Sequence, residues 1–188
     1  MKKLFAKPIR EYCDESVSKV LPRFARVPPP APTDDGSWPA ARAYRMTVAP
    51  DLHLYILLVF MRHDQFAFEI AWSKSDTPPA SDKGVFNSIP ESGEVRDFLS
   101  FLYANKVEEY DPRLNILELP RGADGKPERE AYLKWLSEDP APEVFLPRIH
   151  SGIDEGMMKI CKYAVPYFEK IAAHYGYEIK IECHPVAA

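Results

Sequence analysis

The hydrophobic pattern of the chain is strongest between residues 42 and 73. Residues 43–48 alternate between apolar and polar side chains, residues 52–61 are nearly all apolar, and residues 66–72 alternate again. Two alternating strands that flank a continuously apolar one are typical of a sheet whose middle strand is buried on both faces. The pattern therefore predicts a three-stranded antiparallel meander at about 42–73.

The two turns of this meander fix a register. With two-residue loops at 50–51 and 63–64, Leu57 lies opposite Tyr44 on one side and Ile70 on the other. A four-residue loop at the second turn gives the same pairing. One face of the sheet is then apolar and is predicted to pack on the core: Tyr44, Met46, Tyr55, Leu57, Val59, Met61, Phe66, Phe68, Ile70 and Trp72.

The opposite face of the predicted sheet is the candidate binding surface. It carries an apolar stripe on the central strand and one charged residue on each outer strand: Leu54, Ile56, Leu58, Phe60, Arg45 and Glu69. A helix of the same chain, a partner protein, a second copy of the chain or a ligand could cover it. In the last case Arg45 would orient an anionic group. Burial of residues 54–60 under the chain's own helix would exclude this face as a docking surface.

The remaining periodicity predicts helices and further strands around the meander. In chain order these are a helix at 9–21 with Pro8 in its first turn, a helix at 95–107 with a buried strand as the alternative, a short strand at 114–119, a helix at 128–137, a helix at 153–175 and a strand at 177–183. Pro166 should kink or divide the last helix, and Gly176 fits its C-cap. The alternating charges of 177–183 indicate an edge strand. The fold class is therefore α+β: an antiparallel sheet packed with an N-terminal helix and C-terminal helices.

Length and proline content refine this picture. The 188 residues are within the range of one domain, so we predict a single α+β domain over 1–188. The chain has 19 prolines and only 8 glycines. Its proline content is about twice the usual share of about 5%. The prolines cluster at 22–39, 78–90 and 140–147, which predicts long, semi-stiff loops.

Charge and cysteine content narrow the expected partners and compartment. The net charge of −4 disfavours nucleic acid, whose binding proteins carry a basic patch. The longest apolar run, 54–61, is too short to span a bilayer, and the charged residues within the first eleven positions interrupt any signal sequence. Three cysteines do not make a disulfide framework and fit a reducing compartment. We expect a cytoplasmic protein that binds neither nucleic acid nor membrane.

No motif in the chain predicts a catalytic, metal or cofactor site. Cys161, Cys183 and His184 supply soft ligands, but a structural zinc site needs four ligands with closely spaced pairs. The neighbours His63 and Asp64 lack a nucleophile nearby. Residues 122–126 lack the spacing of a phosphate-binding loop. We therefore predict no catalytic residue, no metal and no cofactor.

Three stretches of the chain resemble an uncharacterised bacterial family, the domain of unknown function 4304. They are Leu-Pro-Arg-Phe at 21–24, the strand at 66–72 and the segment at 164–170. The resemblance spans most of the chain and implies a small α+β domain with an N-terminal helix, an antiparallel sheet and C-terminal helices. Residues 27–40 depart from the family pattern. The shared motifs are hydrophobic, so no active-site residue carries over.

Two functions follow as expectations. The first is a protein-binding module, of a regulatory or immunity type, that meets another protein or a second copy of itself through the sheet face or the proline-rich loops. The alternative is a small hydrolase with a site at the sheet edge, built from Arg45, His53, Glu69 or His63. The absence of a catalytic motif favours the binding module.

Overall fold

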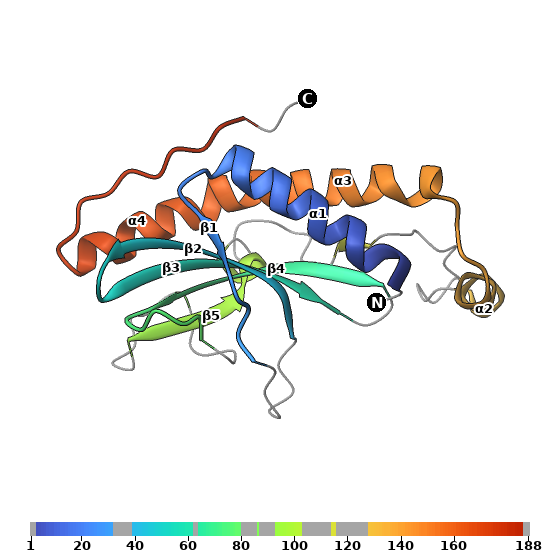
Figure 1. Ribbon diagram of the computed structural model, residues 1–188, viewed down its shortest axis with the longest axis horizontal. Helices are drawn as coiled ribbons and strands as arrows, with labels where there is room; N and C mark the ends of the chain where they lie inside the picture. The colour runs from blue at the N-terminus through green and yellow to red at the C-terminus, as the bar shows by residue number, and fades with distance from the viewer. Residues whose placement is uncertain are drawn as a thin grey trace.

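The computed structural model shows a twisted antiparallel sheet with helices on one side of it (Figure 1). The structure describes residues 3–31, 39–61, 64–79, 86, 93–102, 114–115 and 128–185. Six strands form the sheet: β1 (Ala25–Val27), β2 (Ala40–Ala49), β3 (Leu52–Phe60), β4 (Gln65–Ser73), β5 (Glu94–Phe98) and β6 (Leu114–Asn115). The first five are neighbours in chain order, and β6 also pairs with β4. The predicted meander, now β2–β4, is confirmed.

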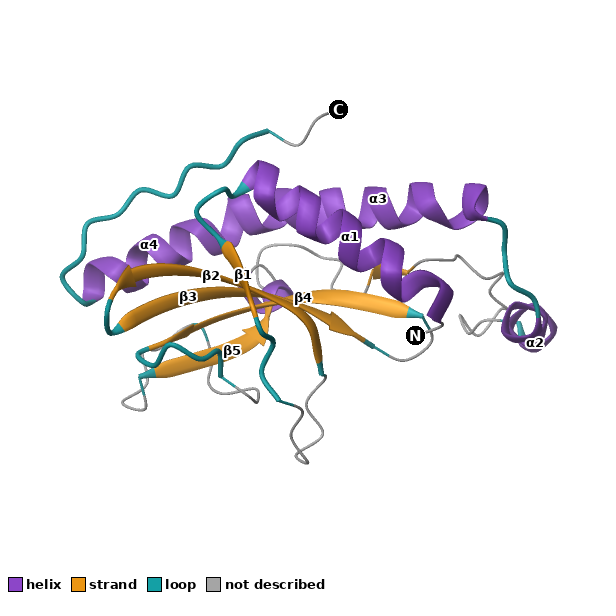
Figure 2. Cartoon of the chain, viewed as in Figure 1, coloured by secondary structure: helices purple, strands orange, loops and turns teal. Residues whose placement is uncertain are grey.

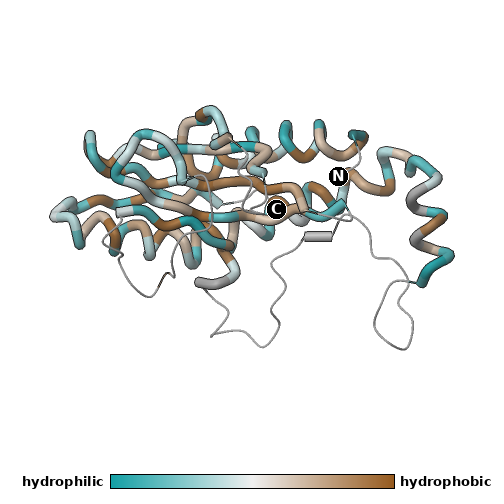
Figure 3. The backbone as a smooth tube through the Cα atoms, turned by 90° about the horizontal axis from the view of Figure 1, so that it is seen from below, coloured by the Kyte–Doolittle hydropathy of each residue, from teal (hydrophilic) through white to brown (hydrophobic). Residues whose placement is uncertain are grey.

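The long helices all lie against the same face of the sheet (Figure 2). The helical elements are α1 (Lys3–Val20), a 3-10 turn (Leu99–Leu102), α2 (Arg129–Ser137), α3 (Pro142–Lys159), a π-helical turn (Ile160–Ala164) and α4 (Val165–His174). The α+β fold class, with its N-terminal helix and C-terminal helices, is confirmed. Seen from below, the central strands carry much of the apolar sequence (Figure 3).

Helix α1 packs on α3 and on the sheet through residues at helical spacing. Its buried positions include Phe5, Ile9, Cys13 and Val17. Phe5 meets Phe145 of α3 edge-on, with ring centroids 5.0 Å apart. This spacing places one apolar stripe toward the core and leaves the charged residues in solvent. Pro8 lies inside α1, not in its first turn, because the helix already begins at Lys3.

A close approach fixes α3 over the sheet. A Cβ atom on Gly156 would overlap the ring of Phe68 from β4. Because glycine has no side chain, α3 can approach β4 closely, and the ring of Phe68 occupies the space that a Cβ atom would take. Further along, the buried Trp72 donates its indole N–H to the hydroxyl of Tyr167 at 3.0 Å, which ties β4 to α4.

The C-terminal helical region divides before Pro166, as predicted. The π-helical turn at 160–164 links α3 to α4, and Pro166 stands in the first turn of α4, where its missing N–H interrupts the helical hydrogen bonds next to this turn. Gly176 follows α4 with φ +84°, and the N–H of Tyr177 bonds the carbonyl of Ala172 at 2.9 Å. This is the expected glycine C-cap.

Four predicted elements differ from the structure. The predicted loop at 22–39 contains a strand, β1, at Ala25–Val27. Residues 95–107 begin with strand β5 and a 3-10 turn, so the strand alternative is confirmed for the start of this segment and the helix is wrong up to residue 102. The predicted proline-rich loop at 140–147 is mostly the first turns of α3, because Pro142 at its first position favours a helix start. Residues 177–183 are extended but pair with no described strand, so the predicted edge strand is wrong. Most of the predicted loop at 78–90 and most of the predicted strand at 114–119 lie outside the described residues.

The predicted register is also wrong, by one residue at each turn. Ala49 does pair with Leu52 across the two-residue turn, but a bulge follows and Thr47 pairs with His53. Val48 is the extra residue, so Tyr44 lies opposite Ile56 instead of Leu57. A bulge of this kind inverts the faces of one strand relative to its neighbour.

The second turn shifts β3 against β4 by the same amount. The N–H of Met61 bonds the carbonyl of Gln65 at 2.8 Å, so three residues separate this pair, and the third, Asp64, has φ +57°. A left-handed third residue is typical of three-residue hairpin loops. Ile56 therefore lies opposite Ile70. Because both shifts run in one direction, β2 and β4 keep their predicted faces and only β3 is inverted.

Candidate functional site

The structure separates the residues predicted to form one binding surface. Leu54, Ile56 and Leu58 are 0% exposed and belong to the core beneath the helices, and Phe60 packs against the same core. We call this side the helix-covered face. Arg45 and Glu69 lie on the opposite face, so the prediction that they share a surface with the apolar stripe is wrong. Burial of the stripe by the chain's own helices excludes it as an exposed docking surface.

The face with Arg45 and Glu69 is covered in part by the loop that follows β4, residues 74–79, on the side away from the helices (Figure 2). We call it the loop-covered face. A small buried cluster lies at its centre: Ala43, Tyr55, Leu57 and Ala71. Pro78 and Pro79 of the loop are themselves buried. The loop therefore covers apolar residues of the sheet on this side, as the helices do on the other side.

Side chains of the sheet hold this loop through its backbone carbonyls. The hydroxyl of Tyr55 donates to the carbonyl of Ser75 at 3.1 Å, and Nη1 of Arg45 donates to the carbonyl of Asp76 at 2.7 Å. Burial raises the pKa of Tyr55 to about 12, so its hydroxyl stays a donor at neutral pH. Arg45, expected to orient an anionic ligand, instead anchors the loop.

An ion pair is buried on the same face. Nε of Arg96 donates to Oε2 of Glu69 at 2.6 Å, and the two side chains are 1% and 0% exposed. Nη1 of Arg96 also donates to the carbonyl of Pro79 at 3.2 Å. Removing one partner of such a pair leaves a buried charge uncompensated, which costs far more than the pair contributes. Sequence reasoning missed Arg96 because the segment around it was predicted to be a helix.

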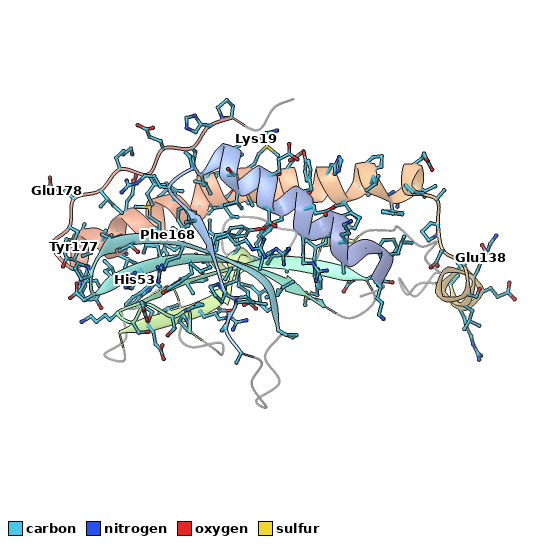
Figure 4. All side chains as sticks on the ribbon, in the orientation of Figure 1. Lys19, His53, Glu138, Phe168, Tyr177 and Glu178 are labelled. Carbon is cyan, nitrogen blue, oxygen red and sulfur yellow. The ribbon has the colours of Figure 1, made fainter. Side chains whose placement is uncertain are left out.

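His53 does not offer a free base for the hydrolase alternative. It is buried in the β2–β3 hairpin, at the end of the molecule where Tyr177 also lies (Figure 4). Its Nε2 lies 3.3 Å from the carbonyl of Pro50, and its Nδ1 lies 3.1 Å from the hydroxyl of Thr47. Since a carbonyl only accepts, Nε2 carries a proton, and in the neutral ring Nδ1 accepts from Thr47. Both ring nitrogens thus stabilise the hairpin. His63 lies outside the described residues.

Among the residues that the structure describes, no metal site forms, and the buried Cys13 is not a nucleophile. No three of their His, Cys, Asp and Glu side chains gather where they could hold a metal ion. Cys13 is buried in α1, and burial raises the pKa of its thiol to about 12. A thiol with so high a pKa is not a nucleophile at neutral pH, because the thiolate is the reactive form.

Asp14 of α1 joins the helix to the first two strands. It accepts from the hydroxyl of Tyr44 at 2.7 Å and from Nε of Arg42 at 3.1 Å, and Nη1 of Arg26 lies 3.3 Å from it. The Arg26 side chain is nevertheless 59% exposed. This cluster fixes where β1 sits and keeps a guanidinium at the surface near its end.

The segment that leaves β1 is the clearest exposed feature of the described chain. Pro28, Pro29 and Ala31 are exposed, Pro30 is partly buried, and none of them is in a helix or turn. Proline fixes its own φ near −65° and pushes the residue before it into the β or polyproline II region. Three consecutive prolines therefore favour an extended backbone for residues 28–30, directly after β1. Strand β1 itself lies at one edge of the described sheet.

Comparisons with known proteins found no match to this chain. No family model, no curated protein and no solved structure matches it. The resemblance to the domain of unknown function 4304 thus stays a prediction. Among the described helices, none is long and apolar enough to cross a bilayer. The exposed surface of the described residues is therefore the basis for a proposed function.

Proposed function

We propose that this protein is a protein-binding module that presents residues 28–31, the proline segment, to a partner domain. The observation that carries the proposal is the exposure of Pro28 and Pro29 directly after the edge strand β1. Of the surfaces expected from the sequence, the apolar stripe is buried, whereas Pro28 and Pro29 of the first proline-rich loop are exposed.

The chemistry of the segment indicates what kind of partner it fits. A polyproline II helix is stiff before binding, so little conformational entropy is lost when it docks. Domains with aromatic-lined grooves recognise such segments, commonly in the spacing P-x-x-P. Pro29 and Pro32 have this spacing in the sequence. The partner class is therefore a small domain with an aromatic groove.

Arg26 supports an orientation for the bound segment. Its guanidinium is mostly exposed and stands two residues before Pro28, held by Asp14 at 3.3 Å. An acidic residue beside the partner's groove would pair with it and fix the direction in which the prolines are read. Charge complementarity of this kind contributes more to specificity and association rate than to affinity.

A binding experiment with matched proline variants tests the proposal. The full chain is titrated against a panel of isolated SH3 and WW domains, and heteronuclear NMR or calorimetry follows binding. We expect at least one domain to bind, and the double variant Pro28→Ala, Pro29→Ala to weaken that binding by roughly tenfold or more, which is about 1.4 kcal/mol. Pro22→Ala, an exposed proline outside the segment, should bind like the parent.

Two results would overturn the proposal. One is that no domain of the panel binds the full chain. The other is that the double variant, folded by circular dichroism, binds as tightly as Pro22→Ala. Arg26→Ala adds a finer test, because it should slow association and reduce the salt dependence of binding while leaving the fold intact, since exposed ion pairs contribute little to stability.

A further inference from the structure

The segment after α4 runs back along the helices in an extended form toward the end of α1 (Figure 1). We call residues 177–185 the tail. The N–H of Ile181 donates to Oε1 of Glu169 on α4 at 2.9 Å, and the side chain of Ile181 is 4% exposed and packs in the core. The tail is therefore docked on the body of the fold, although it pairs with no described strand.

Two further anchors tie the tail to the connection between α1 and β1. The N–H of His184 donates to the carbonyl of Val20, the last residue of α1, at 2.9 Å. Nη1 of Arg23, which stands two residues before β1, donates to the carbonyl of Lys180 at 3.0 Å. The tail thus bridges α4 and the end of α1, and it contacts the connection at both of its ends.

This connection is a short turn that leads directly to the proline segment. The N–H groups of Leu21 and Phe24 donate to the carbonyls of Val17 and Leu21, at 2.9 Å each. Phe24 is 4% exposed, and its ring lies 6.0 Å from that of Phe168 on α4. Strand β1 has only three residues, and the proline segment follows it at once. A contact that fixes this turn therefore also fixes the point from which the proline segment leaves the sheet.

Most of the tail is in solvent while it is docked. Its exposed residues are Glu178, Lys180, Glu182, Cys183 and His184. Ordering an extended segment costs conformational entropy at every residue, and segments with few buried apolar contacts open locally while the rest of the fold stays intact. We therefore expect the tail to exchange between a docked and an undocked state without unfolding of the sheet.

We propose that the tail is a strap whose docking holds the connection from α1 to β1 and so presents the proline segment in one orientation. With the tail docked, the segment leaves a fixed turn, and less conformational entropy is lost when a partner binds. With the tail undocked, the turn loses its contacts at Val20 and Arg23, and the segment moves more freely. The effect on partner binding rests on the proposed function, whereas the coupling between the tail and the turn does not.

Amide hydrogen exchange of the full chain, followed by NMR, tests this coupling without a partner. The amides to follow are those of His184 in the tail and of Leu21 and Phe24 in the turn, with Met61 of the β3–β4 hairpin as the reference. Ile181→Asp places a carboxylate at a core position and should undock the tail. We expect exchange at the first three amides to become roughly tenfold faster or more, with no change at Met61.

A reciprocal variant changes the turn and is read at the tail. Arg23 is exposed, so Arg23→Ala should leave the chain folded while it removes the bond to Lys180. We expect exchange at His184 to become roughly threefold faster. Glu178→Ala, at an exposed tail position outside these anchors, should exchange like the parent.

Two results of these exchange measurements would overturn the strap. One is that folded Ile181→Asp exchanges faster at His184 but like the parent at Leu21 and Phe24, because the tail would then lie on the turn without holding it. The other is that Arg23→Ala exchanges like the parent at His184. The second result decides the matter even if Ile181→Asp does not fold.

Partner binding distinguishes a failure of the strap from a failure of the proposed function. With a domain that binds the parent, Ile181→Asp should weaken binding by about threefold, whereas Glu178→Ala should not. Equal binding by the parent and folded Ile181→Asp would overturn the strap and leave the proline segment as the binding site. If no domain binds the parent, the proposed function fails, and the exchange at Leu21, Phe24 and His184 still confirms or overturns the coupling.

Discussion

On one side of the sheet, α1, α3 and α4 press large apolar side chains against β3 and β4, whereas on the other side the loop at 74–79 is held by hydrogen bonds. The helix-covered face is closed by apolar packing: Leu54, Ile56 and Leu58 are fully buried among helix residues. The loop-covered face is closed by Tyr55, Arg45 and the Glu69–Arg96 pair.

The difference arises because helices and loops bring different backbone groups to the sheet. A helix satisfies its own backbone, so it needs only apolar contact with the sheet. A loop brings carbonyl groups that have no partner, and burying them without one is costly. Tyr55, Arg45 and Arg96 donate to three of these carbonyls, at Ser75, Asp76 and Pro79. Charged residues that looked like a binding site in the sequence are therefore structural anchors.

The largest effect should come from the buried ion pair on the loop-covered face. Arg96→Met leaves the Glu69 carboxylate buried without its cation and should reduce the free energy of unfolding by roughly 3–5 kcal/mol. The double variant Glu69→Leu, Arg96→Met should recover most of this loss, because it removes both charges together. Urea denaturation measures both. A cost for Arg96→Met below that of the double variant would contradict the assignment.

A pair of neighbouring truncations on β3 compares the two faces directly. Ile56→Ala on the helix-covered face should cost roughly 3–5 kcal/mol, because the packed helices cannot collapse into the cavity. Leu57→Ala on the loop-covered face should cost roughly 2–3 kcal/mol, because a loop relaxes more easily. Both residues are fully buried, so exposure does not bias the comparison. The reverse order in urea denaturation would favour the register with Leu57 opposite Tyr44.

The smallest effect concerns a single anchor of the loop and its pH dependence. Tyr55→Phe removes the bond to Ser75 and should cost about 1 kcal/mol at neutral pH. Burial raises the pKa of Tyr55 from 10.0 to about 12, so its contribution is fully present below pH 10 and is lost as the pH rises through 12. The difference in unfolding free energy between parent and variant should therefore shrink from pH 10 to 12. A difference that stays constant would exclude Tyr55 as the titrating group.

Much of the fold could be predicted from local pattern, and the misplaced parts have a common cause. Alternation placed Tyr44, Met46, Phe68 and Ile70 on the correct face, because each lies in a strand with one polar side. Strand β3 is apolar on both sides, so its sequence gives no preference for either face. Its orientation was inferred from turn lengths alone, and one bulge and one extra loop residue inverted it.

The candidate site could be predicted only in fragments. Arg45 and Glu69 were identified as charged residues in strands, but their partners were not: Asp76 lies in a loop, and Arg96 lies in a segment predicted to be a helix. Such contacts join residues far apart in sequence, and no local preference encodes them.

The sequence by itself determined the strands of the meander, the helix at 129–137, the division of the C-terminal helix at Pro166 and the cap at Gly176, since each depends on residues close together in the chain. Only the tertiary structure decided which face of β3 meets the helices, what covers the other face and where residues 177–185 lie. The physical reason is that these outcomes depend on which surfaces pack together. An apolar strand or an arginine gains its role only from the neighbour that folding brings to it.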